Sequence, residues 1–177
     1  IKKSKLMELL KLISYGSKQL KEGKILSHRI DSELLMSKVL KKAREEILIN
    51  LDQKISTQKV NKFYELIKRR KTKEPIAYIF NKKEFWSKNF IVNRETLIPR
   101  PETELLVDEI IKIFKSRRIR ILDIGTGTGC ILLSLLSDLK NSTGLGVDIS
   151  QHAIKVAKKN AKKLKLTKRA KFFKKSI

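Results

Sequence analysis

The residues with the clearest potential for chemistry lie in one short segment, Ile121-Leu122-Asp123-Ile124-Gly125-Thr126-Gly127-Thr128-Gly129. Three glycines within five residues predict a tight turn whose backbone can approach a bound cofactor, because no side chain blocks the way. The helix expected at 130–139 would offer free N–H groups and a partial positive charge, which suit a carboxylate. A second acidic residue, Asp148, ends the next predicted strand. The segment therefore predicts a cofactor loop flanked by two acids.

Two classes of cofactor are bound by loops of this kind. Dinucleotides favour the spacing G-x-G-x-x-G, whereas the spacing here is G-x-G-x-G and Cys130 stands where the third glycine would be. S-adenosylmethionine has no pyrophosphate but carries an ammonium and ribose hydroxyls. Asp123 suits the ammonium, and Asp148 can accept hydrogen bonds from the ribose hydroxyls. We predict S-adenosylmethionine, with a dinucleotide site or a turn used only for packing as alternatives. The predicted cofactor-binding residues are Asp123, Gly125, Thr126, Gly127, Thr128, Gly129 and Asp148.

The elements around this loop predict an α/β fold. Strands are expected at 119–124, 145–147 and 170–173, with helices at 130–139 and 150–164 between them. Ser150 is the expected cap of the second helix. Strands that alternate with helices indicate a parallel sheet with right-handed crossovers.

Before residue 72, apolar residues at helical spacing predict a small helical bundle. The first helix carries Leu6, Leu9, Leu10 and Ile13. The second, at 31–40, would direct Leu34, Leu35, Val39 and Leu40 inward and Glu33 and Lys38 outward. A third would be capped by Ser56 or Thr57 and would bury Val60, Phe63 and Ile67.

Between the bundle and the sheet, alternating apolar residues predict a β-hairpin. Its strands would be 76–80 and 84–92, with 81–83 between them. Pro99 and Pro101 then force an extended segment. Pro101 can occupy the first turn of the next helix, whose buried side would carry Leu105, Leu106, Ile110 and Phe114.

Several motifs, in this order, resemble the HemK/PrmC family, the peptide chain release factor N5-glutamine methyltransferases. They are Lys73-Glu74-Pro75-Ile76-Ala77-Tyr78, Glu84-Phe85-Trp86, Thr96-Leu97-Ile98-Pro99-Arg100-Pro101-Glu102-Thr103-Glu104 and the glycine loop. The Ile-Pro-Arg-Pro-Glu-Thr-Glu stretch is the specific signal, since many methyltransferases share the loop. Asp31-Ser32-Glu33-Leu34-Leu35 also resembles that family's helical N-terminal domain.

The resemblance implies a domain organisation and an activity. Residues 1–72 would be a helical substrate-recognition domain, 73–100 a β-hairpin linker, and 101–177 a class I, Rossmann-like methyltransferase domain. The activity would be S-adenosylmethionine-dependent methylation of the glutamine amide nitrogen in the Gly-Gly-Gln loop of release factors, which affects translation termination. Pro99, Arg100 and Pro101 would line the mouth of the active site.

One departure from the family concerns the end of the chain. Family members carry Asn-Pro-Pro-Tyr after strand four, and the sequence ends at Ile177 without this motif, so no catalytic residue is predicted. We hypothesise a fragment with an incomplete C-terminal domain, in which Ile119, Ile121 and Ile124 lie on an exposed sheet edge. Whether such a chain is active or folds alone stays open. The alternatives are a tRNA or rRNA methyltransferase and a non-catalytic remnant.

The amino-acid composition indicates which partners and which location to expect. The formal net charge is +24 over 177 residues, which indicates RNA or ribosome proximity or a compositional bias toward lysine; both interpretations stay open. One cysteine permits no internal disulfide and is typical of a cytoplasmic protein. No apolar run approaches a membrane span of roughly 20 residues. We expect a cytoplasmic monomer whose protein partner is a release factor.

Three further positions have a chemical and a structural interpretation. Cys130 begins a predicted helix, where a thiol pKa is lowered, or it is a small residue that packs under the loop. Phe85 and Trp86 serve either as a substrate platform or to pack the hairpin. The two histidines, His28 and His152, have no cysteine or acidic cluster around them, so no metal site is predicted.

Overall fold

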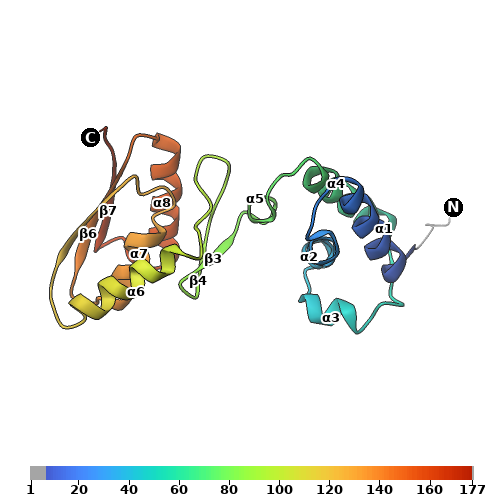
Figure 1. Cartoon of the computed structure of the whole chain (residues 1–177), viewed down its shortest axis with the longest axis horizontal. Helices are drawn as coiled ribbons and strands as arrows, with labels where there is room; N and C mark the ends of the chain where they lie inside the picture. Colours follow the sequence, from blue (N-terminus) through green and yellow to red (C-terminus); the bar gives the residue numbers. More distant parts are fainter. Residues whose placement is uncertain (1–6, 177) are drawn as a thin grey trace. The chain divides into compact units, whose positions relative to one another are not determined.

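The computed structural model describes residues 7–176. The chain forms two compact units, and the boundary between them in the sequence falls between Phe80 and Asn81. Figure 1 labels the helices and strands of each unit. The residues predicted as a linker, 73–100, are thus shared between the two units. Leu6, which was expected on the first helix, lies outside the described residues.

The first unit is a helical bundle, as predicted. Helices α1, α2 and α4 contact one another, α3 contacts α2, and α5 contacts α4. Fully buried side chains such as Leu12, Leu35 and Phe63 form the core, and Val60 and Ile67 are buried as expected. The elements are β1 (Met7–Glu8), α1 (Leu9–Glu22), α2 (His28–Leu40), α3 (Arg44–Leu48), β2 (Lys54–Ile55), α4 (Thr57–Lys71) and α5 (Ile76–Phe80), with β1 and β2 antiparallel.

Two expectations about this unit were wrong. Glu33 is buried rather than outward, because Arg44 of the unpredicted helix α3 reaches it with a 2.6 Å ion pair; a buried carboxylate requires such a partner. Leu10 is 48% exposed, because α1 turns Leu9, Leu12, Ile13 and Leu20 toward its neighbours.

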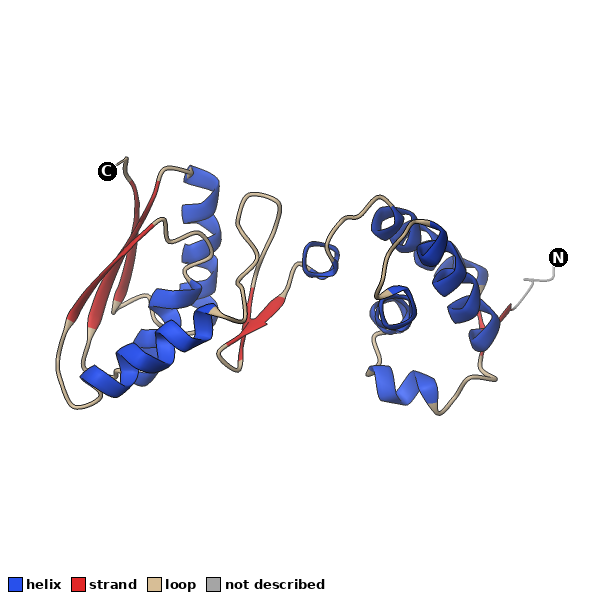
Figure 2. Ribbon diagram, in the orientation of Figure 1, coloured by secondary structure: helices blue, strands red, loops and turns tan. Residues whose placement is uncertain are grey.

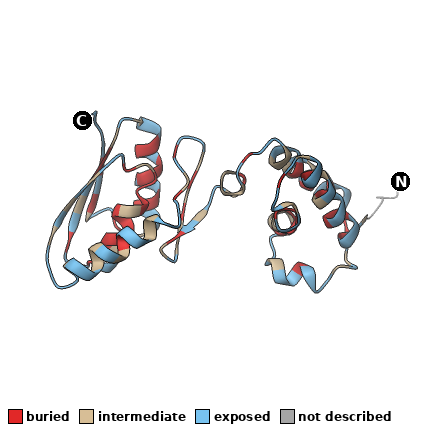
Figure 3. Ribbon diagram, in the orientation of Figure 1, coloured by how far each residue is buried: buried red, intermediate tan, exposed pale blue. Residues whose placement is uncertain are grey.

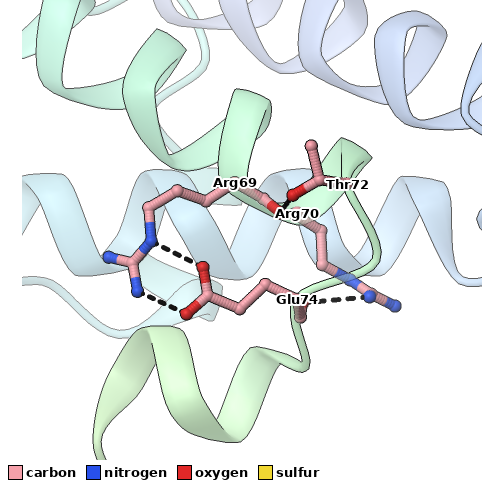
Figure 4. Close-up of polar contacts among 4 residues, drawn as sticks. All are labelled: Arg69, Arg70, Thr72 and Glu74. Atoms are coloured by element: carbon pink, nitrogen blue, oxygen red, sulfur yellow. Dashed lines mark hydrogen bonds and ion pairs between the residues drawn. The ribbon is translucent and has the colours of Figure 1, made fainter. Parts of the chain in front are cut away.

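The segment that leaves α4 is fixed by two arginines (Figure 4). Arg69 donates two hydrogen bonds to the buried Glu74 carboxylate, Nε to Oε2 and Nη2 to Oε1, each 2.8 Å long. Arg70 donates to Asp31 Oδ2 at 2.7 Å and to the Glu74 carbonyl at 3.1 Å. Such paired bonds hold a planar guanidinium in one geometry, so the chain leaves α4 in a defined direction.

The hairpin forms, but not from the predicted strands. Residues 76–80 are helix α5, and the hairpin pairs β3 (Lys83–Phe85) with β4 (Lys88–Phe90). Proline is favourable in the first turn of a helix, and the amides of Tyr78 and Ile79 donate to the Pro75 carbonyl. A segment of only five mostly apolar residues fits both the helical and the strand period. The alternation of apolar residues alone therefore led to the wrong prediction of a strand at 76–80.

The second unit contains the predicted parallel sheet. Its strands are β5 (Arg120–Ile124), β6 (Thr143–Asp148) and β7 (Ala170–Lys174), in the order β5-β6-β7 with both pairs parallel. Helices α7 (Cys130–Asp138) and α8 (Gln151–Lys163) contact the sheet, and α6 (Thr103–Phe114) contacts α7. In Figure 2 these helices lie on one side of the strands. Ser150 caps α8 as predicted, its Oγ accepting from the Ala153 amide.

The two faces of the sheet differ in burial, and Figure 3 colours the ribbon by the burial of each residue. Toward the helices, Phe172 is buried, and a Cβ atom at Gly144 would collide with Leu132 of α7. On the opposite face, Leu122, Ile124 and Phe173 are 56%, 62% and 56% exposed. Among the described residues β5 forms one edge of the sheet. Of the isoleucines expected on that edge, 119 and 121 are half-buried and 124 is exposed.

Helix α6 buries only part of the predicted face: Ile110 and Phe114 are half-buried as expected, but the two leucines are not. Leu105 and Leu106 are 71% and 50% exposed, whereas Val107 is fully buried. Ile110 and Ile111 pack against the core of this unit. The spacing 107, 110, 111 forms one helical stripe, and that stripe faces α7.

Candidate functional site

The glycine loop between β5 and α7 adopts a conformation that its glycines permit. Gly125, Gly127 and Gly129 have φ values of 72°, 53° and 76°, in the left-handed region that glycine enters without steric cost. The amides of Gly125 and Thr126 both donate to the Val147 carbonyl at 2.9 Å. The loop is therefore fastened to the end of strand β6.

Asp123 lies beneath the loop at the end of β5. Its Oδ2 accepts a hydrogen bond from Thr126 Oγ1 at 2.7 Å. Burial raises the pKa of the Asp123 carboxyl, and the hydrogen bond from Thr126 opposes part of that rise. A half-buried carboxylate in this position favours a cationic neighbour, because a positive charge would offset its lost hydration.

Asp148 is brought to the other side of the same loop. Its Oδ2 accepts from the Gly127 amide and its Oδ1 from the Ser150 amide, both at 2.9 Å. Two strands that end at the same edge of a parallel sheet thus bring Asp123 and Asp148 to the loop. Carboxyl ends of strands in such sheets are the usual place for ligands.

A cavity of about 270 Å³ opens at these strand ends. Gly125 and Asp148 line it, and so do Ile149 and Lys175, which the sequence reasoning did not single out. The other predicted cofactor-binding residues, Asp123, Thr126, Gly127, Thr128 and Gly129, do not line it. Thr126 and Thr128 are buried, so they act by shaping the loop. Ile149 is 71% exposed, and an apolar residue directly after the acid of β6 is the signal that points to it.

Cys130 at the start of α7 is buried. Burial raises the pKa of its thiol, and a hydrogen bond with Thr128 only partly opposes this. The expectation of a lowered pKa at the helix N-terminus was therefore wrong, because burial of the thiol outweighs the hydrogen bonds that lower its pKa. The structure supports the packing interpretation of Cys130.

Asn160 of α8 holds the loop in place, and the sequence reasoning missed it. It is fully buried. Its Nδ2 donates to the Thr128 carbonyl at 2.9 Å and to the Ile91 carbonyl at 3.0 Å, and its Oδ1 accepts from the Ile91 amide at 2.7 Å. The available signal was an asparagine on the apolar stripe of a helix, since buried amides need partners.

The segment predicted to line the active-site mouth precedes α6. Pro99 is buried, whereas Arg100 and Pro101 are exposed. The carbonyls of Arg100 and Pro101 accept from the amides of Thr103 and Glu104, which starts the helix. None of the three residues lines the cavity at the strand ends, so their predicted role stays a prediction.

The hairpin aromatics make structural contacts. Phe85 is buried and packs edge-on against Phe90, with ring centroids 6.1 Å apart. The Trp86 indole donates to Asp138 Oδ2 at 2.6 Å, and its amide donates to Glu104 Oε1 at 2.9 Å. These contacts support packing of the hairpin rather than a substrate platform.

No group of three or more His, Cys, Asp or Glu residues that could hold a metal ion occurs within residues 7–176. His28 Nδ1 lies 2.9 Å from Ser17 Oγ, and His152 Nδ1 lies 3.4 Å from Glu95 Oε2. None of the helices described here combines the length and apolar character that crossing a bilayer requires.

Comparisons with known proteins agree with this geometry. Residues 11–80 match the PrmC N-terminal domain, and residues 115–177 match a methyltransferase domain. The chain is 46% identical over 154 residues to the release factor glutamine methyltransferase of Buchnera aphidicola subsp. Schizaphis graminum (strain Sg), covering 85% of this chain and 56% of that protein. It is 40% identical over 161 residues to the protein of that name in Buchnera aphidicola subsp. Baizongia pistaciae (strain Bp), covering 90% and 58%.

A longer relative also matches most of the chain. The bifunctional methyltransferase of Rickettsia prowazekii (strain Madrid E) is 40% identical over 159 residues, which cover 79% of this chain and 31% of that protein. The chain spans about half the length of the release factor glutamine methyltransferases that it matches.

Proposed function

We propose that this chain, which belongs to the PrmC family of methyltransferases, binds S-adenosylmethionine and serves the methylation of a release factor's glutamine side-chain amide. The observation that carries this proposal is the combination in one chain of a PrmC N-terminal domain and a methyltransferase domain. The release factor glutamine methyltransferases named above have 40% and 46% identity to it across both parts. The product would be a methylated glutamine in the Gly-Gly-Gln loop, which acts in translation termination.

The residues around the loop suit S-adenosylmethionine. Asp148 would accept hydrogen bonds from the ribose hydroxyls, and Asp123 would face the ammonium, whose charge offsets the desolvation that raises the pKa of this carboxyl. The first turn of α7, which follows Gly129, would bind the carboxylate. The cofactor supplies an electrophilic methyl group when it is bound.

The substrate contributes a weak nucleophile, because the amide nitrogen lone pair is delocalised. Transfer is an in-line displacement that depends on positioning. The parts that this chain does hold are the cofactor loop, Asp123, Asp148 and the family's N-terminal domain, which would recognise the release factor.

A second candidate function is methylation of RNA, which the basic segment 149–177 favours because it contains no acidic residue. The two functions separate in a filter assay with labelled S-adenosylmethionine, where the chain is offered purified release factor or tRNA. Label on the release factor supports the first function. Label on tRNA alone contradicts it and supports the second.

We also propose that the chain acts in the cytoplasm as a monomer, near the ribosomes on which release factors work. Light scattering after size-exclusion chromatography tests the oligomeric state. A mass near 20.5 kDa supports a monomer, and a mass twice as large contradicts it.

A further inference from the structure

The positive charge of the second unit is concentrated in its last segment. Residues 81–148 contain eleven Lys or Arg and nine Asp or Glu, whereas residues 149–177 contain eleven Lys or Arg and no acid. In the first unit, residues 1–80, nine acids accompany twenty basic residues. A uniform drift toward lysine would tend to leave acids in every segment, so the uneven distribution favours a local cause.

The ten lysines of this segment are all exposed, and none forms an ion pair with a carboxylate of the described residues. Lys163 is engaged through its Nζ, which donates to the Asn89 carbonyl at 2.6 Å. Arg169 is used structurally, since its guanidinium donates to the carbonyls of Leu136, Leu139 and Ser142 at the end of α7. The positive charge of the other lysines therefore faces solvent.

Three of these lysines surround one cavity. It measures about 380 Å³ and lies between α8 and β7. Lys158 and Lys162 approach it from α8 and Lys171 from β7, while Phe172 and Phe173 contribute apolar surface. We name this feature the lysine groove; it is lined by Lys158, Ala161, Lys162, Thr167, Ala170, Lys171, Phe172 and Phe173.

We propose that the lysine groove binds single-stranded RNA. Lysines without nearby acids attract the phosphate backbone over a long range. Phe173 is 56% exposed, and an exposed aromatic ring offers any base a surface for stacking. The groove thus has lysines on both elements that border it, and the exposed Phe173 ring lies on the open face of the sheet at strand β7. This combination suits a strand that alternates flat bases with phosphates and passes over β7.

An acidic peptide is the main competitor, because β7 is the other edge of the described sheet. The lysines would attract either ligand, but the exposed aromatic ring can stack on a base and has no such partner in an acidic peptide. The combination therefore favours RNA. The groove shares no lining residue with the cavity at the strand ends, although Phe172 packs beside Gly129 of the glycine loop. The proposal therefore stands whether or not the proposed methyl transfer is correct.

The test is fluorescence anisotropy of the full chain with a fluorescein-labelled oligouridylate 20-mer over a range of salt concentrations. We expect the triple variant Lys158→Glu, Lys162→Glu, Lys171→Glu to weaken binding at least about 30-fold. The salt slope should fall by about 2, since each single-strand phosphate contact contributes roughly 0.7. The matched control is Lys18→Glu, Lys59→Glu, Lys62→Glu, three exposed lysines of the first unit with the same change of charge; it should weaken binding less than about 3-fold.

A second variant tests the aromatic contact separately. Phe173→Ala should weaken RNA binding by about 5-fold or more, as expected for a lost stacking partner, without changing the salt slope. Circular dichroism melting of each variant establishes that it is folded. Equal weakening by both lysine triples overturns the proposal, as does a labelled oligoglutamate 20-mer that binds as tightly as the RNA. Failure of the unaltered chain to bind the RNA at about 100 mM salt, where phosphate contacts still contribute strongly, overturns it as well.

Discussion

The helical unit and the sheet unit bury their apolar residues in different ways. In the bundle, three helices enclose side chains such as Leu12 and Phe63, which are fully buried. In the sheet, one face packs under α7 and α8, while Leu122 and Ile124 on the other face are more than half exposed. Parallel sheets are generally covered on both faces. An apolar side chain in the core of the bundle therefore contributes much more to the free energy of unfolding than one of the same type on the open face of the sheet.

The largest effect should come from the core of the bundle. Phe63→Ala removes a fully buried ring that packs beside Gly16 and Tyr64, and we expect a loss of about 3–5 kcal/mol in the free energy of unfolding. Urea denaturation followed by circular dichroism measures it. The matched variant on the open sheet face, Leu122→Thr, should change that free energy by less than about 0.5 kcal/mol. Equal losses would show that the open face is covered in solution.

Within the sheet unit, Asn160→Leu should be the most damaging change near the loop. It removes the partners of the buried Thr128 carbonyl and of both part-buried Ile91 backbone groups, and an unpaired buried group costs about 1–3 kcal/mol. We expect faster hydrogen exchange at the glycine loop amides and weaker cofactor binding. The control is Lys155→Leu on the exposed side of α8, which should leave both measurements unchanged. Equal effects of the two variants would show that Asn160 does not hold the loop.

Asp123 should make the loop sensitive to pH. Because burial raises its pKa in the folded state, the ionised form is disfavoured there. Its contribution to stability is present below the unfolded pKa, about 3.9, and is lost as pH rises through the folded pKa. Asp123→Asn should therefore raise the melting temperature of the ligand-free chain at pH 7 while it weakens S-adenosylmethionine binding. A lower melting temperature would show that the charge stabilises the loop by itself.

The smallest effect concerns the hairpin turn. Trp86 and Ser87 both have positive φ values, 50° and 52°, as a two-residue turn of the primed type requires. Neither is a residue that adopts this conformation readily. Ser87→Gly should stabilise the second unit by about 0.5–1 kcal/mol, seen as a shift of its thermal midpoint. Gly146→Ala should have the opposite effect, since its new Cβ would lie 2.6 Å from Phe172.

Local patterns in the sequence predicted the loop, the parallel sheet and the bundle well. The spacing of the three glycines and the acids at two strand ends are short-range signals, and the structure brings Asp123 and Asp148 to one loop. The five residues 76–80 fit two periods, so a pattern could not decide between strand and helix. Proline at their start was the better guide.

Contacts between distant residues were beyond the reach of such patterns. The partner of Glu33 is Arg44 from a helix that was not expected, and the three hydrogen bonds of Asn160 reach segments 32 and 69 residues away. Likewise, the burial of Cys130 depends on how α7 packs, and this decided the direction of its pKa. Lys175 was identified as a cavity-lining residue only when the strand ends were placed side by side.

Isothermal titration of this chain with S-adenosylmethionine tests the central claim most directly. The account predicts binding to the unaltered chain, at least about 10-fold weaker binding to Asp148→Asn, because a charge-assisted hydrogen bond contributes about 1.5–3 kcal/mol, and unchanged binding to Glu109→Gln on the exposed side of α6. Equal affinity of the Asp148→Asn variant, or tighter binding of a nicotinamide dinucleotide than of S-adenosylmethionine, would contradict it.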